Sequence, residues 1–156
     1  MDNEEKQVID ADEILKRYAA GERKFSNICV EGSDELAGAD LRDVDFSNSI
    51  LAKMILEEVN LSNASLTKIH LGLSILYSAN LQGADLTEAI LTFTEFTGAN
   101  LTDAKLVSAN LSNAVMDSAN LKNVNFSGSN IKEAYFYKAI FDNTLMPDGS
   151  IRNHNL

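Results

Sequence analysis

Residues 76–101 have the sequence LYSANLQGADLTEAILTFTEFTGANL, and a large apolar residue stands at every fifth position of this stretch. The same spacing continues without a gap from Leu36 to Met146, at 23 positions that hold only Leu, Phe, Met or Ile. A five-residue step along an α-helix turns by roughly 140°, which would scatter these side chains around the helix. In a plain β-strand an odd repeat would send them alternately to opposite faces. The chain must therefore turn once in each five-residue unit.

A second apolar position, most often Ala, lies two residues before most of the large ones. A small inward residue, a polar outward residue and a large inward residue describe a three-residue strand, and the two remaining residues form a corner. Corner pairs are rich in turn-forming residues, as in Ser62-Asn63, Gln82-Gly83, Thr97-Gly98 and Ser112-Asn113. One unit is too short to bury its own apolar side, so successive coils must stack on a shared core.

The charged residues indicate how many units make one coil, because residues one coil apart lie about 4.8 Å from each other and like charges there repel. A 15-residue coil would stack three like-charge pairs and two opposite pairs, and a 25-residue coil one like pair and one opposite pair. A 20-residue coil stacks no like pair and three opposite pairs: Lys68/Glu88, Asp85/Lys105 and Lys122/Asp142. We therefore expect four units per coil, a square cross-section, and a column of stacked amides formed by Asn60, Asn80, Asn100 and Asn120.

Triplets such as Ala39-Asp40-Leu41, Ala84-Asp85-Leu86 and Ala99-Asn100-Leu101 recur through this region. They resemble the A(D/N)LXX signature of the pentapeptide-repeat proteins, which are common in bacteria and abundant in cyanobacteria. The resemblance covers about 110 of the 156 residues. It implies an all-β fold, a right-handed quadrilateral β-helix of nearly six coils. The handedness is implied by the family and not by the spacing.

Three segments are expected along the chain. Residues 1–24 form an N-terminal segment that contains a short capping helix at about 10–20. Residues 25–146 form the pentapeptide-repeat β-helix. Residues 147–156 form a C-terminal tail, because a Pro-Asp-Gly turn ends the period and too few apolar residues follow for a docking helix.

The helix prediction depends on local signals near the start of the chain. Asp10 and Glu13 fit a capping box, and Gly21 fits the residue that follows the helix end. Such a helix would cover the open end of the solenoid, whose unpaired strand edge invites further pairing. After it, Phe25 and Val30 fit two additional core units that are shifted by one residue from the main register.

The composition limits the classes of partner and the cellular location. A net charge of −10 argues against direct binding to nucleic acid or to an anionic membrane. The acidic start is followed by no apolar run, so we expect no signal peptide, no membrane span and a cytoplasmic location. The single cysteine, Cys29, excludes an internal disulfide and is expected to be an inert, buried thiol.

No pattern of residues indicates catalysis. The two histidines, His70 and His154, have no Cys or acidic cluster at ligand spacing, so no metal site is expected. Glycine-rich phosphate loops, nucleophile elbows and Cys/His pairs are absent from the sequence, and no cofactor is expected. A convex rod without a cleft would also offer no place to exclude water from a reaction. We therefore expect that the protein is not an enzyme.

Apolar residues at outward positions are the informative exceptions to the repeat. With 20-residue coils, one group falls in the same sector of three consecutive turns, and an exposed apolar patch of this kind usually marks an interaction surface. This candidate partner surface consists of Ile50, Ile55, His70, Leu73, Ile75, Tyr77, Ile90 and Phe93. The alternative is that the N-terminal helix or the C-terminal tail folds back over it. A second group near the C-terminal end is a candidate dimer contact, or else β-favouring filler: Val115, Tyr135, Tyr137 and Ile140.

These observations favour a non-catalytic protein–protein interaction module, a rigid rod that presents its apolar sector to a protein partner and acts as a monomer or weak homodimer. The family resemblance implies that some members regulate bacterial differentiation or metabolism through protein contacts. It also implies an alternative, a DNA mimic that binds DNA gyrase or another topoisomerase. That alternative requires a strongly negative face, whereas residues 36–156 carry a net charge of only −5.

Overall fold

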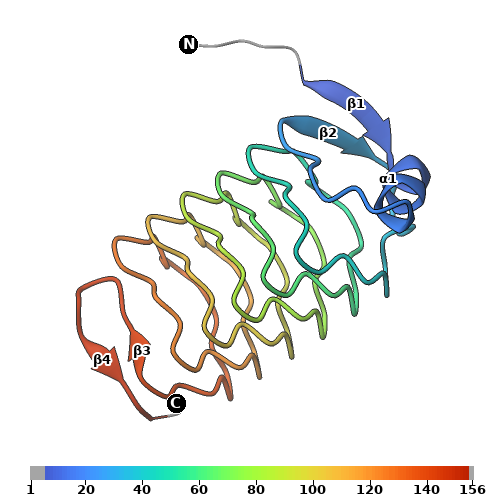
Figure 1. The fold of residues 1–156 in the computed structure, drawn as a ribbon. Coiled ribbons are helices and arrows are strands. Elements are labelled where there is room, and N and C mark those ends of the chain that lie inside the picture. The colour runs from blue at the N-terminus through green and yellow to red at the C-terminus, as the bar shows by residue number, and fades with distance from the viewer. Residues whose placement is uncertain (1–5, 155–156) are drawn as a thin grey trace.

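The computed structural model of the protein describes residues 6–154. Its helices and strands are β1 (Gln7–Asp10), α1 (Ala11–Ala19), β2 (Ile28–Glu31), β3 (Thr144–Leu145) and β4 (Ile151–Arg152). Between β2 and β3 the chain winds into a solenoid of stacked coils (Figure 1). Residues 1–5 and 155–156 lie outside this description, so the start of the predicted N-terminal segment and the end of the predicted tail fall there.

Parallel bridges between residues 20 positions apart hold neighbouring coils together. Each coil contributes four bridging residues, one in each strand-like segment, and these stack into four columns along the solenoid. Asn60 bridges Asn80, Ser65 bridges Asp85, and His70 bridges Ile90. The expected 20-residue coil is confirmed.

The large residue of each repeat points into the solenoid and forms its core. Leu86, Leu91 and Phe96, in the middle of the array, are 0% exposed. Hydroxyl groups that share this interior are bonded to the coil below, as the Thr94 hydroxyl is when it donates to the Leu71 carbonyl at 2.9 Å. The Ser129 hydroxyl is the exception, since it has no hydrogen-bond partner among the described residues. Buried polar groups that keep a partner cost little, so the core tolerates these hydroxyls.

Each corner places one residue in the left-handed region of the backbone map. Every fifth residue from Gly38 to Asn143 has a positive φ, between 51° and 70°. Backbone bonds close many of these corners, such as the one from Ala104 N to Leu101 O at 2.9 Å. A positive φ at the third residue of the turn is typical of type II turns, and β-branched residues avoid it. No Val, Ile or Thr occupies any of these left-handed positions between residues 38 and 143.

The N-terminal coil is one residue longer than the others. Strand β1 pairs in parallel with β2 at a spacing of 21 residues, and Cys29 of β2 bridges Ile50 at the same spacing. Phe25 and Val30 are both buried in the core, so the one-residue shift predicted for these two units is present. Cys29 itself is only half-buried, because its side chain lies on the outward side of β2. The pairing of β1 with the solenoid was not predicted from the sequence.

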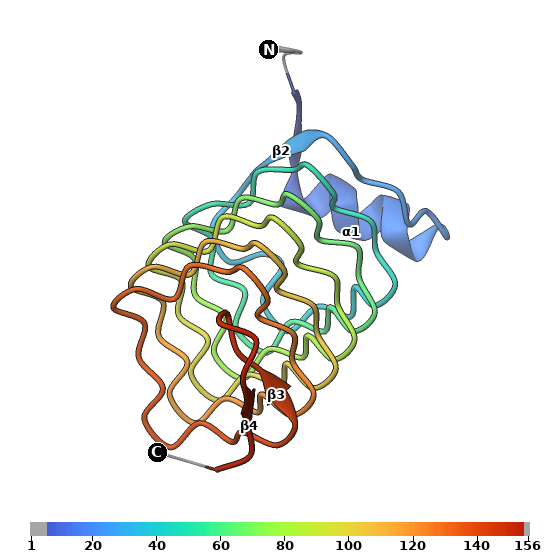
Figure 2. The same ribbon diagram turned by 90° about the vertical axis from the view of Figure 1, so that its left-hand side faces the viewer.

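Helix α1 begins after Asp10, whose carboxylate accepts a hydrogen bond from Glu13 N at 2.8 Å. The Glu13 carboxylate lies 3.8 Å from Lys16 Nζ, and only the Asp10 half of the capping box is observed. Ala11 and Ile14 of the helix are buried, and the helix lies at the N-terminal end of the solenoid (Figure 2). Within residues 6–154, no helix has both the length and the apolar character needed to span a membrane.

At the opposite end the chain forms a hairpin. Strand β3 pairs antiparallel with β4, and the turn between them is closed by a bond from Met146 N to Ser150 O at 2.8 Å. The Asp148 carboxylate accepts from Ser150 N at 3.0 Å. The sequence predicted that the period ends here, but it did not predict that the following residues pair with the last coil.

Candidate interaction surface

One outward column of the solenoid is apolar at almost every coil. It runs through Ile55, Ile75, Glu95, Val115 and Tyr135, each of which bridges the next. Ile55 and Ile75 of the predicted partner surface thus lie on the same column as Val115 and Tyr135 of the predicted dimer contact, whereas Ile50, His70 and Ile90 form the neighbouring column. This alignment could have been found from the sequence, because Ile55 and Val115, and Ile75 and Tyr135, are each 60 residues apart.

The residues that flank this column are the most exposed apolar side chains of the sector. Leu73 is 56% and Phe93 is 55% exposed at one corner, and Tyr137 is 66% exposed at the other. We define the apolar face as the column together with its two corners and the adjacent bridging residues: Ile50, Ile55, His70, Leu73, Ile75, Tyr77, Ile90, Phe93, Val115, Tyr135 and Tyr137. Glu95 is the charged residue of its central column.

The structure separates some of the predicted site residues from the rest. Ile140 is 46% exposed but bridges Asn120, so it lies on the next column, apart from Val115 and the two tyrosines with which it was grouped. The bridging residues also differ in exposure, because Ile90 and Tyr135 are exposed whereas others are half-buried. Ile55 and Ile75 are half-buried between the two corners, and Ile50 and His70 are half-buried on the neighbouring column.

Neither of the expected covering segments lies over the apolar face. Helix α1 packs at the N-terminal end through Ala11 and Ile14, and β4 pairs with β3 at the C-terminal end. Leu73 and Phe93 remain more than half exposed. Among residues 6–154, the face is open to solvent at these two side chains.

His70 has a packing role in this surface. A Cβ atom added to Gly72 would lie 3.0 Å from His70 Nε2, so the imidazole lies close over the backbone of the following corner. Ile50 and Ile90 are its bridge partners below and above. In the described part of the chain, no three His, Cys, Asp or Glu residues are grouped so that they could hold a metal ion.

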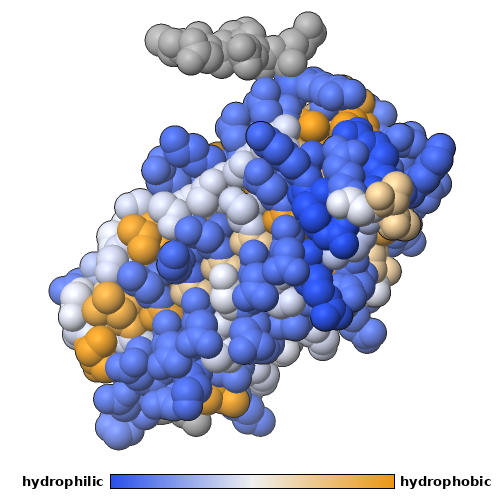
Figure 3. All heavy atoms as spheres, in the orientation of Figure 1, coloured by the Kyte–Doolittle hydropathy of each residue, from blue (hydrophilic) through white to orange (hydrophobic). Residues whose placement is uncertain are grey.

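Polar ladders occupy the other sides of the solenoid. Nδ2 of Asn60, Asn80 and Asn100 each donate to the side-chain oxygen one coil below, at 3.1 to 3.3 Å. Asn120 continues the predicted column through its bridge to Asn100. In the view of Figure 3, hydrophilic residues dominate and hydrophobic ones gather mainly toward the C-terminal end.

The three ion pairs predicted between coils are all present. Lys122 Nζ lies 2.9 Å from Asp142 Oδ2, and the corresponding distances are 3.7 Å for Lys68 with Glu88 and for Lys105 with Asp85. Positive and negative side chains are therefore neighbours along these stacks.

The ladder that contains Asn60 begins with an ion pair. Arg42 Nη2 lies 2.7 Å from Asp40 Oδ2, and the hydrogen bond from Arg42 holds the pKa of the Asp40 carboxyl below its usual value. Asn60 also donates to this carboxylate at 3.1 Å. Both partners of the ion pair are more than half exposed, so the pair contributes little to the stability of the fold.

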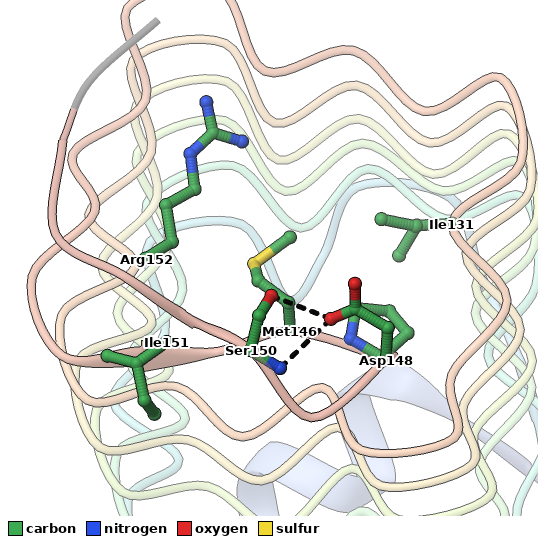
Figure 4. A pocket seen from close by; sticks show the side chains of 7 residues that line it. Ile131, Met146, Asp148, Ser150, Ile151 and Arg152 are labelled. Carbon is green, nitrogen blue, oxygen red and sulfur yellow. Dashed lines mark hydrogen bonds between the residues drawn. The ribbon is translucent and has the colours of Figure 1, made fainter.

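A pocket of about 450 Å³ lies at the C-terminal end, beside the β3–β4 hairpin, which corrects the expectation of a rod without a cleft (Figure 4). It is lined by Ile131, Met146, Pro147, Asp148, Ser150, Ile151 and Arg152. The Asp148 carboxylate accepts a hydrogen bond from the Ser150 hydroxyl at 2.6 Å. The Arg152 guanidinium lies 3.8 Å from the centre of the Phe141 ring. These contacts stabilise the hairpin and do not arrange polar groups around a reacting centre.

Comparison with known proteins gives one consistent result. A family model described as pentapeptide repeats matches residues 35–61, 55–92, 94–132 and 109–146, with eight copies. A search of curated proteins found no match.

Solved structures of pentapeptide-repeat proteins resemble the chain. Rfr23 from the cyanobacterium Cyanothece 51142 is 27% identical with a TM-score of 0.61, over 83% of this chain and 94% of that one. A protein of the Arabidopsis thaliana thylakoid lumen is 30% identical with a TM-score of 0.55, over 60% of this chain and 65% of that one. HetL from the cyanobacterium Nostoc is 24% identical with a TM-score of 0.34, over 92% and 100%.

The repeat spacing, the stacked coils and these matches agree. Pentapeptide-repeat structures imply a right-handed β-helix, which is consistent with the parallel bridges between successive coils. The matched segments together cover residues 35–146 except Phe93, which is well over half of the sequence. The chain therefore belongs to the pentapeptide-repeat family.

Proposed function

We propose that this protein is a non-catalytic protein–protein interaction module, a rigid rod that presents the apolar face to a protein partner. The observation that carries the proposal is the exposure of Leu73 and Phe93, which are 56% and 55% exposed at one corner of the face. Burying such side chains against a partner is favourable, by about 25 cal/mol for each Å² of apolar surface removed from water.

The scaffold supports this role. Four bridge columns in each 20-residue coil support a quadrilateral cross-section, in which every coil is fixed by its neighbours. The burial of Ile14 at the N-terminal end supports a capping role for α1, which would keep other chains from adding to that end. A cytoplasmic location, a 25–146 repeat domain and the absence of catalysis are parts of the same proposal.

A DNA mimic that binds a topoisomerase is the weaker alternative. Its support is the net charge of −10, but the acidic residues of the solenoid are interspersed with lysines. Lys68, Lys105 and Lys122 each pair with an acidic residue one coil away. Mimicry predicts inhibition of DNA supercoiling that weakens as salt rises, because the contact would be electrostatic.

The direct test is affinity capture from an extract of the source organism. The variant Leu73→Glu/Phe93→Glu places two charges on the apolar face. The control variant Asn63→Glu/Ser108→Glu adds the same charge at exposed corner positions that also have positive φ, but on other corners. Circular dichroism first establishes that all three proteins are folded.

We expect one protein that is retained by the wild type and by the control and is lost with Leu73→Glu/Phe93→Glu. Equal capture by all three would place the binding surface elsewhere and overturn the proposal. Recovery of a topoisomerase by all three, together with salt-sensitive inhibition of supercoiling, would support the DNA-mimic alternative.

A further inference from the structure

The two corners on either side of the central column of the apolar face, which contains Ile75, carry complementary side chains at the same coil levels. All ten positions have a positive φ and all but Asn113 are exposed. The first corner consists of Lys53, Leu73, Phe93, Asn113 and Glu133. The second corner consists of Glu58, Ser78, Gly98, Ser118 and Lys138. Across the central column, residues of opposite charge therefore lie at the same level in the first and the fifth of these coils. In the second and third coils a large side chain lies across from a small residue, and in the fourth coil two polar residues lie across from each other.

We propose that the occupant of the apolar face is a second copy of this chain, packed face to face with the two solenoids parallel. This inference rests on the proposed function, because it names the partner of the same surface. A two-fold axis along the solenoid direction exchanges the first corner of one copy with the second corner of the other. The contact is isologous, so each pairing occurs twice.

The charges at the ends of the face are available for such a contact. Within residues 6–154, Lys53, Glu58 and Lys138 take part in no ion pair, and Glu133 lies 3.9 Å from the exposed Lys132. The proposed dimer places Lys53 opposite Glu58 and Glu133 opposite Lys138 of the second copy. These pairs lie about 19 Å apart along the solenoid, since four coils separate them. They would form a polar rim around an apolar centre.

The sizes of the central corner residues distinguish the parallel arrangement from an antiparallel one. In the parallel dimer Leu73 faces Ser78 and Phe93 faces Gly98, so each large side chain meets a small one. A Cβ atom added to Gly98 would have Ser78 Oγ, at 3.6 Å, as its neighbour, which leaves space at this corner. An antiparallel dimer also pairs opposite charges, but it places Phe93 on Phe93 and Gly98 on Gly98.

Glu95 opposes this association. It occupies the middle of the central column, so the two copies would bring their Glu95 carboxylates together near the axis. Like charges in a partly apolar contact repel, so the dimer should be weak. Replacement of Glu95 by Gln removes this repulsion and should lower the dimer dissociation constant by about tenfold.

Sedimentation velocity over a concentration series at low salt tests the arrangement. The full chain is compared with Lys53→Glu, Glu58→Lys, the double swap Lys53→Glu/Glu58→Lys, and the double swap Lys53→Glu/Glu133→Lys. Each single change should raise the dissociation constant by about tenfold, because two symmetric pairs become repulsive. The Lys53/Glu58 double swap should restore the wild-type value, and the Lys53/Glu133 double swap should weaken the dimer further.

If the Lys53→Glu/Glu133→Lys variant instead had the wild-type dissociation constant, the parallel arrangement would be overturned, because Lys53 faces Glu133 only in an antiparallel dimer. A wild-type chain and a Glu95→Gln variant that both remain monomeric at every concentration would overturn the dimer itself. The proposed function is tested separately by Leu73→Glu/Phe93→Glu: a monomeric chain that still captures another protein through this face refutes only the inference of a second copy.

Discussion

The left-handed corner positions predict a strong dependence of stability on side-chain shape. Ser108 has a φ of 56° and is exposed, and it follows Val107 at the same corner. One coil above, the corresponding residues are Ser127 and Gly128, and the positive φ belongs to Gly128. The same change, Ser to Val, can therefore be made at a left-handed position with Ser108→Val and at a nearby position without positive φ with Ser127→Val.

The magnitude follows from backbone sterics. A non-glycine residue in the left-handed region costs roughly 1–2 kcal/mol, and a β-branched residue is less tolerated still. Ser108 already bears part of this cost, so Ser108→Val should lower the free energy of unfolding by about 1–2 kcal/mol. Ser127→Val should change it by less than about 0.5 kcal/mol. Ser108→Gly should be near neutral, because relief of strain is offset by the entropy of the unfolded chain.

Urea denaturation followed by circular dichroism measures these differences. The predicted order of midpoints places Ser108→Val clearly below the wild type, with Ser127→Val and Ser108→Gly close to it. Equal midpoints for the two valine variants would refute the argument that positive φ selects the residues at these corners.

Three further predictions concern the ladder, the first ion pair and the core. Asn80→Asp removes the Nδ2 group that donates to Asn60 Oδ1 and places a carboxylate next to that oxygen. Urea denaturation should show a free energy of unfolding lower by about 1 kcal/mol at neutral pH, and a smaller decrease in acid. Folding lowers the pKa of Asp40, so the unfolded chain binds more protons than the folded one at acidic pH. The stability that the ionised Asp40 contributes is complete above the pKa of the unfolded chain and is lost as the pH falls through the pKa of the folded chain. Thermal scans should therefore show a smaller loss of stability in acid for Asp40→Asn than for the wild type; an equal loss would contradict this. Leu86→Ala opens a cavity at a 0% exposed position and should cost roughly 2–5 kcal/mol, whereas a cost below about 1 kcal/mol would show that the coils collapse around it.

The sequence allowed the coil to be predicted because two independent signals agree. The five-residue spacing requires a turn in each unit, and the stacked charges, such as Lys122 above Asp142, select 20 residues per coil. The start of the helix was also predictable, since Asp10 is its N-cap. These features depend on local chemistry or on a repeated spacing, and both are visible in one sequence.

Other features depend on contacts that the repeat does not encode. The pairing of β1 with β2 joins residues outside the regular array. The β3–β4 hairpin could have been suspected from the Pro147-Asp148-Gly149 turn between two short β-favouring segments, but its pairing with the last coil is a tertiary contact. By contrast, the position of Ile75 and Tyr135 on one column could have been predicted, because the 20-residue coil places residues that are 60 positions apart above each other.

The central claim is that the apolar face contacts a protein. The most direct measurement places a photo-crosslinking phenylalanine analogue at Phe93, and in a control at Ser108, and irradiates the folded protein in an extract of the source organism. Both positions are exposed and have positive φ, but only Phe93 lies on the face. We predict a discrete protein adduct from Phe93 and none from Ser108, and the mass of the adduct distinguishes a second copy of the chain from another protein. Equal adducts from both positions, or an adduct from Ser108 alone, would contradict the claim.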